Sequence, residues 1–266
     1  MPEWAATAAR HFTGEKFSTC HAPGDGCTVV PVMRSLLVLL FLCVNLGLES
    51  QAAEPVVDLK LVLAVDASGS VDMDEYALQL SGIAAGFRDP SVRKAIASGP
   101  AKAIAVNLLV WAEPQVPKDV TGWFIIASDG DAENFARIVE TFPRRQTGAT
   151  AIGEGIASAL RSIATSGIAA PREVVDVSGD GRESVAREYT VLVDQARAMA
   201  LSRGVVINGL AIANEVSDLA DYYREKVQTG PESFVMEAKT YQDFAEAMRR
   251  KLLREIEYRP RVSSLP

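Results

Sequence analysis

Three oxygen-bearing side chains, those of Asp66, Ser68 and Ser70, stand at alternate positions at the end of a largely apolar run. The run, residues 59–66, is typical of a strand that is buried on both faces of a parallel sheet. Open α/β sheets bind ligands at the carboxyl ends of their strands, which is where these three residues stand. Carboxylate and hydroxyl oxygens are hard donors that suit Mg²⁺, Mn²⁺ or Ca²⁺ better than softer metals. The spacing therefore predicts a site for a divalent cation.

Two more oxygen-bearing residues adjoin later predicted elements. Thr150 stands at the start of a predicted helix over 151–165, and Asp180 follows a predicted strand over 173–178. Loops that follow parallel strands open on the same edge of a sheet, so both residues can meet the first three. Each residue alone also has a structural interpretation: Asp66 as a turn or cap residue, Thr150 as an N-cap, and Asp180 as a turn residue. The five residues together favour a metal site.

Other acidic residues near predicted helix starts are interpreted as structural. Asp72 and Asp74 are expected to be charges at the start of a helix, and Asp129 and Asp131 to form a turn and a cap. Glu113, just beyond a predicted strand, is expected to be a solvated charge at the rim of the site.

The rest of the chain positions these residues through alternating strand-like and helix-like segments. This alternation is typical of a Rossmann-like α/β fold with a doubly wound, mostly parallel central sheet flanked by helices. No repeat and no internal linker interrupts the pattern, so we expect a single domain over residues 54–258. The predicted strands span 59–66, 103–111, 120–127, 173–178, 205–213 and 233–236, and the predicted helices span 74–88, 131–142, 151–165, 185–202, 216–227 and 241–257.

The segment 33–53 has the pattern of a secretory signal peptide, with a basic residue, a short apolar core and a small-x-small triplet at residues 50–52. The core is shorter than the roughly 18–20 residues of a membrane-spanning helix, although a retained N-terminal anchor is an alternative. Residues 1–32 fit poorly ahead of a signal, so we expect them to lie outside the domain, with translation starting at Met33. The tail 259–266 is expected to be flexible. The predicted location of the protein is the periplasm or the cell exterior.

Removal of the predicted signal peptide changes the chemistry available to the chain. All cysteines and histidines lie before residue 53, so the mature chain is expected to lack disulfides, Cys or His metal sites, a Ser-His-Asp triad and a cysteine nucleophile. Three basic and four acidic residues also leave, which changes the net charge from −7 to about −6. An acidic balance gives no support to nucleic-acid binding. No apolar run after residue 53 is long enough to span a membrane.

The motif residues and the order of the predicted elements resemble the von Willebrand factor A domain. That family's metal-ion-dependent adhesion site combines an Asp-x-Ser-x-Ser motif with a distant Thr and a distant Asp. The matching positions in this chain are Asp66, Ser68, Ser70, Thr150 and Asp180. The resemblance covers nearly the whole mature chain and is strongest to bacterial exported proteins of undefined role, the DUF1194-like group.

The resemblance implies a mechanism and a partner. It implies that the three hydroxyls contact Mg²⁺, or Mn²⁺ or Ca²⁺ in its place, and that the two aspartates hold the ion directly or through water. It also implies an open position on the ion, which a Glu or Asp of a protein partner fills. Two positions depart from the family pattern: Gly179 precedes Asp180 where Thr is frequent, and Ala149 precedes Thr150 where Gly is common. Neither departure removes a ligand.

These features favour an exported binding module that engages a protein partner through a divalent ion. The alternatives are a metal-dependent hydrolase that uses the same site and a structural domain without metal. Enzyme signals are weak, because the chain lacks a Gly-x-Ser-x-Gly elbow and a phosphate-binding Gly-x-x-x-x-Gly-Lys motif. A hydrolase without His or Cys would need metal-bound water and a carboxylate base, and the predicted site offers no obvious spare base.

Overall fold

The structure is a computed structural model that describes residues 55–185, 188 and 190–257. The predicted extension 1–32, the predicted signal peptide 33–53 and the predicted tail 259–266 lie outside these residues. Within the described part of the chain, no helix has the length and apolar character needed to cross a membrane.

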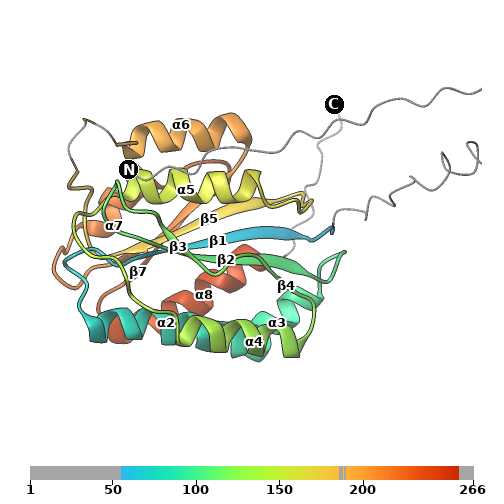
Figure 1. The fold of residues 1–266 in the computed structure, drawn as a ribbon. Coiled ribbons are helices and arrows are strands. Elements are labelled where there is room, and N and C mark those ends of the chain that lie inside the picture. The colour runs from blue at the N-terminus through green and yellow to red at the C-terminus, as the bar shows by residue number, and fades with distance from the viewer. Residues whose placement is uncertain (1–54, 186–187, 189, 258–266) are drawn as a thin grey trace, which may run out of the picture. The chain divides into compact units, whose positions relative to one another are not determined.

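A seven-stranded sheet forms the centre of the described domain (Figure 1). Its strand order is β3-β2-β1-β5-β6-β7, and β4 also pairs with β2. The longer strands run parallel, whereas the short strands β3 and β4 run antiparallel to β2. The strands are β1 (Leu59–Asp66), β2 (Ile104–Trp111), β3 (Asp119–Val120), β4 (Phe124–Ile126), β5 (Glu173–Gly179), β6 (Val206–Ile212) and β7 (Val235–Ala238). This topology confirms the predicted α/β fold.

Helices cover both faces of the sheet, as Figure 1 shows. One face carries α2 (Met73–Arg88), α3 (Pro90–Ala97), α4 (Asp129–Glu140) and α8 (Phe244–Ile256). The other face carries α5 (Ile152–Ala164), α6 (Val193–Arg203), the short α7 (Leu219–Tyr222) and a π-helix, η1 (Tyr223–Val227). A 3₁₀ turn, η2 (Tyr241–Asp243), leads directly into α8.

Strand β1 shows why the central strands are apolar on both sides. All eight of its residues are buried. Leu61, Leu63 and Val65 belong to the core that includes α2 and α8, whereas Val62 and Ala64 belong to the core that includes α5. Successive side chains of a strand point to opposite faces of the sheet, so both sets of positions are apolar. This packing fixes the strand up to its last residue, where the predicted metal site begins.

The sequence-based prediction missed one helix, α3. Its N-cap is Asp89, whose side chain accepts hydrogen bonds from the backbone amides of Ser91 and Val92. Pro90 occupies the first turn, where the amide that proline lacks would have no helical partner. The Asp-Pro pair is therefore a helix-start signal. Apolar periodicity does not reveal α3, because the helix is short and buries only two of its residues.

The predicted helix over 185–202 starts too early, because α6 begins only at Val193. Two carboxylates bind the backbone at this point. Glu154 Oε1 accepts a hydrogen bond from the amide of Val191 at 2.7 Å, and Glu183 Oε2 accepts one from the amide of Val193 at 3.1 Å. These side chains are distant in sequence, and they bind backbone amides at and just before the start of α6. Residues 186, 187 and 189 of the predicted helix lie outside the described residues.

Two predicted strands also differ from the structure. The predicted strand over 120–127 is interrupted at Gly122, whose φ of 81° suits glycine, and the segment forms β3 and β4 instead. The predicted strand over 233–236 lies two residues later, as β7. It starts late because the amide of Phe234 donates a hydrogen bond to the side chain of Asn208 rather than to the sheet ladder.

Candidate metal centre

Four of the predicted ligands are linked by hydrogen-bond contacts at the edge of the sheet where β1 and β5 end. Ser68 Oγ lies 3.3 Å from Ser70 Oγ, and Ser70 Oγ donates a hydrogen bond to Asp180 Oδ1 at 2.7 Å. The backbone amide of Ser68 donates to Asp66 Oδ1 at 2.7 Å. The fold thus joins the loop after β1 to the loop after β5, although Ser70 and Asp180 are 110 residues apart.

Thr150 lies beside these residues. Its Oγ1 lies 3.4 Å from the position that a Cβ atom on Gly181 would occupy, and Ser70 Oγ lies 4.0 Å from the same position. The amide of Thr150 donates to Ser184 Oγ at 3.0 Å, and its carbonyl accepts from the amide of Ser184 at 3.0 Å. The alternative role of Thr150 as an N-cap is wrong, because Ala151 holds that position in α5 and makes no side-chain cap.

Backbone contacts fix the loop that carries the two serines. The amide of Gly69 donates to the carbonyl of Gly148 at 2.8 Å, which joins this loop to the one that carries Thr150. The loop with the two serines is also held by Arg144, whose Nη2 donates to the carbonyls of Ala67 and Ser68 at 3.2 and 2.9 Å. The hydroxyls are therefore presented by a loop with several hydrogen bonds to its surroundings.

Glu113 is half-exposed and supports the Thr150 loop, a role that its interpretation as a solvated rim charge does not include. Its Oε2 accepts a hydrogen bond from the amide of Ala149 at 2.8 Å. The neighbouring Gly148 has a φ of 111°, and a Cβ atom there would overlap the same carboxylate oxygen. The carboxylate thus fixes the turn that leads into Thr150. Sequence spacing gave no signal for this contact, because the two partners are 36 residues apart.

Asp66 is a buried carboxylate with an oxygen that lacks a partner. Its side chain is 0% exposed, and its Oδ2 has no hydrogen-bond partner among the described residues. Burial, and then the nearby charge of Asp180, raise the pKa of Asp66 to about 7. A cation beside both carboxylates would supply the missing counter-charge and a partner for Oδ2. The orphaned oxygen and the surrounding hydroxyls therefore fit a hard divalent cation.

The cluster is buried on its inner side and open at Ser70. Ser68, Thr150 and Asp180 are buried, whereas Ser70 is exposed to solvent. In the part of the chain that the structure describes, no group of three or more His, Cys, Asp or Glu side chains is placed to hold a metal ion. A cation at this edge would therefore depend on hydroxyl ligands and would keep positions for water or another incoming oxygen.

Two buried tyrosines that the sequence-based prediction missed lie close to the carboxylates. Tyr241 Oη donates a hydrogen bond to Asp180 Oδ2 at 3.0 Å. Tyr223 Oη and Asp66 Oδ2 lie 2.8 and 2.7 Å from the position that a Cβ atom on Gly179 would occupy. Glycine at this position, one of the departures from the family pattern, therefore leaves room for both oxygens. No motif spacing relates the tyrosines to the aspartates, so only the fold reveals them.

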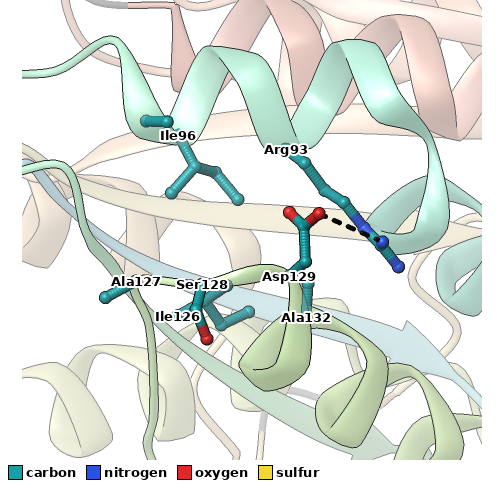
Figure 2. Close-up of a pocket in the computed structure, with 8 residues that line it drawn as sticks. Arg93, Ile96, Ile126, Ala127, Ser128, Asp129 and Ala132 are labelled. Carbon is teal, nitrogen blue, oxygen red and sulfur yellow. Dashed lines mark ion pairs between the residues drawn. The ribbon is translucent and has the colours of Figure 1, made fainter.

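Two hollows lie elsewhere, and no predicted ligand lines either of them. Figure 2 shows the smaller one, of about 40 Å³, where Arg93 of α3 pairs with Asp129 of α4 at 3.9 Å. Ser128 caps α4 there and donates to Asp131, so Asp129 and Asp131 have the predicted structural role, but they lie in the first turn of the helix and neither is the N-cap. The larger hollow, of about 1010 Å³, lies at the amino ends of β1, β5 and β6, away from the metal centre.

Comparison with protein families gives one match to most of the chain. The family model is described as a protein of unknown function, DUF1194, and it matches residues 56–260. The match includes all five predicted ligands and nearly all of the described domain. No curated protein matches the chain.

Solved structures share the fold at low sequence identity. The pilus adhesin SpaC from Lactobacillus rhamnosus GG matches with a TM-score of 0.54 and 14% identity, over 77% of this chain and 31% of SpaC. The vWF domain of the type V pili tip protein Mfa5 from Porphyromonas gingivalis matches with a TM-score of 0.52 and 12% identity, over 79% of this chain and 99% of that domain. Proximal thread matrix protein 1 from the mussel byssus matches with a TM-score of 0.50 and 14% identity, over 77% of this chain and 47% of that protein. The chain thus spans less than half the length of SpaC and of the byssus protein, and the shared feature is the fold of a von Willebrand factor A-type domain.

Proposed function

Because the chain belongs to the DUF1194 family and has a von Willebrand factor A-type fold, we propose that it is a module that binds a protein partner through a divalent metal ion. The observation that carries the proposal is the unpartnered, fully buried Oδ2 of Asp66. This oxygen lies in a cluster of hydroxyls that also contains a second carboxylate, which is a poor environment for an uncompensated charge. A cation would compensate the buried charge of Asp66, and this explanation of the cluster requires no catalytic base.

The proposed ion is Mg²⁺, with Mn²⁺ or Ca²⁺ as substitutes that share its preference for oxygen. The hydroxyls of Ser68, Ser70 and Thr150 would contact it, and the carboxylates of Asp66 and Asp180 would hold it directly or through water. When bound, the ion supplies a Lewis-acidic position that can accept an oxygen from outside the domain.

The proposed partner group is a Glu or Asp side chain. Asp180 already accepts hydrogen bonds from Ser70 and Tyr241, so part of its charge is engaged within the domain. An ion with few direct carboxylate ligands remains electron-poor and attracts an anionic oxygen. Arg144, which lies against the loop after β1, adds positive charge beside the site and favours the same kind of partner.

We also propose that the module acts outside the cytoplasm, in the periplasm or at the cell exterior. The predicted signal peptide over 33–53 supports export. SpaC is a pilus adhesin and Mfa5 is a type V pili tip protein, and the fold that they share with this chain supports a location outside the cytoplasm. Immunodetection of the protein in periplasmic and culture fractions, against the cytoplasmic fraction, tests this location.

A metal-dependent pull-down tests partner binding. The immobilised protein is incubated with the envelope fraction of the source cells in Mg²⁺ or in EDTA, and the experiment is repeated with Asp66→Ala. Asp74→Ala is the matched control, because Asp74 is an exposed charge in the first turn of α2 and not a predicted ligand. We expect the wild-type protein and Asp74→Ala to retain a partner in Mg²⁺ only. Equal retention by Asp66→Ala, or retention unaffected by EDTA, would contradict the proposal.

A further inference from the structure

Both carboxylate oxygens of Asp180 accept hydrogen bonds from side-chain hydroxyls. Ser70 Oγ donates to Oδ1 at 2.7 Å, and Tyr241 Oη donates to Oδ2 at 3.0 Å. Asp180 and Tyr241 are both buried, with 4% and 3% of their surfaces exposed. A tyrosine hydroxyl carries its proton at neutral pH, so the phenol can donate to the carboxylate.

The segment that carries Tyr241 is firmly packed. Tyr241 lies in η2, which leads directly into α8. Helix α8 approaches α2 so closely that a Cβ atom on Gly82 would lie 2.7 Å from the ring of Phe244. Further along α8, the fully buried Lys251 Nζ lies 2.7 Å from Asp176 Oδ1 of β5. A hydroxyl donor held by such packing can orient a carboxylate before an ion binds.

We propose that Tyr241 is a positioning residue of the metal centre, which holds the Asp180 carboxylate in the orientation that the ion requires. Tyr241 acts through Asp180 and does not touch the ion. Without the phenol, Asp180 Oδ2 becomes a buried acceptor with no described protein donor, so the carboxylate reorients or draws in water. Ion binding must then also order that carboxylate, and the affinity for the ion falls.

This inference rests on the proposed function, because it concerns the same metal site. Calorimetric titration of Mn²⁺ into the purified protein, without a partner, compares the wild type with Tyr241→Phe, which keeps the ring and removes only the hydroxyl. Tyr76→Phe is the matched control, since Tyr76 is also buried and its hydroxyl has no hydrogen-bond partner among the described residues. We expect the Kd for Mn²⁺ to rise about 10- to 100-fold in Tyr241→Phe and to stay unchanged in Tyr76→Phe.

A double-mutant cycle separates positioning from a general loss of structure. If Tyr241 acts through Asp180, Tyr241→Phe lowers Mn²⁺ affinity much less when Asp180 is already replaced by Asn, which keeps one oxygen for the ion but has an NH₂ donor in place of Oδ2. Urea unfolding in EDTA verifies that each variant is folded. Unchanged Mn²⁺ affinity in Tyr241→Phe, or an equal loss in the Asp180→Asn background, would overturn the inference.

The two possible failures are distinguishable. If the wild type binds Mn²⁺ and Asp66→Ala does not, an unchanged Kd in Tyr241→Phe removes the positioning role and leaves the metal site standing. If the wild type binds no Mn²⁺, the metal site and the positioning role are both overturned.

Discussion

Replacement of Asp66 by Asn tests the electrostatic strain that we assign to the metal-free site. Asn has nearly the same shape, and its Oδ1 can still accept the hydrogen bond that the Ser68 amide donates to Asp66 Oδ1 at 2.7 Å. The substitution removes the buried charge and replaces Oδ2 with an NH₂ group of similar size. We expect Asp66→Asn to be more stable than the wild type at pH 8 without metal, which is the opposite of the usual effect of a substitution in a buried cluster.

The magnitude follows from the pKa of Asp66. Burial and the charge of Asp180 raise this pKa from 3.8 to about 7, so the folded protein holds the proton more tightly than the unfolded chain. The contribution of the protonated Asp66 carboxyl to the free energy of unfolding of the wild type is therefore fully present below pH 4 and is lost as the pH rises through 7. Three pKa units correspond to about 4 kcal/mol. The amide of the Asp66→Asn variant does not titrate, so the advantage of the variant grows from near zero at pH 4 to about 4 kcal/mol at pH 8.

Urea unfolding of both proteins in EDTA, at pH values from 4 to 8, measures this difference. Asp176, whose pKa burial and the charge of Glu255 also raise, is present in both proteins, so its own pH dependence cancels. Asp131→Asn is a control for which we expect the opposite change, a loss of stability at pH 8. Hydrogen bonds from Ser128 and Ala127 lower the pKa of Asp131 and favour its charged form, which the variant lacks. Excess Mg²⁺ should stabilise the wild type and not Asp66→Asn. A stability difference at pH 8 that is zero or favours the wild type would refute the reasoning.

Two further substitutions test the packing around and beneath the site. Gly179→Ala places a Cβ atom 2.7 Å from Asp66 Oδ2, so we expect the free energy of unfolding in urea to fall by about 1–3 kcal/mol. An unchanged urea midpoint would contradict this close approach. Lys251→Met removes the buried ammonium that pairs with Asp176, so we expect a loss of about 3–5 kcal/mol at pH 8. Burial, and then the charge of Glu255, raise the pKa of the Asp176 carboxyl, so the loss should shrink as the pH falls towards 4, and a loss independent of pH would contradict the role of charge.

The sequence was sufficient for the fold because the fold depends on local patterns. The choice of the five site residues as ligands stays a prediction. The apolar run of β1 is buried on both faces, and its length and the alternation with helices predict a parallel sheet. The oxygen-bearing residues after β1 and β5 then fall at one edge by topology alone. The contact between Ser70 and Asp180 confirms that these two loops meet. Metal binding itself stays a prediction.

The parts that could not be predicted depend on contacts between distant residues. Glu113 has the sequence context of a solvent-exposed charge, and only the fold brings it to the amide of Ala149. Tyr241 is separated from Asp180 by 61 residues and belongs to no motif of the site. The start of α6 also involves distant residues, because the carboxylates of Glu154 and Glu183 bind backbone amides at and just before it.

A metal titration tests the central claim most directly. Mn²⁺ and Mg²⁺ are titrated by calorimetry into the wild-type protein, into Asp66→Ala and into the surface control Asp74→Ala. The account predicts one saturable site per chain in the wild type and in Asp74→Ala, and no binding in Asp66→Ala. Absence of binding in the wild type, or the same affinity in Asp66→Ala, would contradict it.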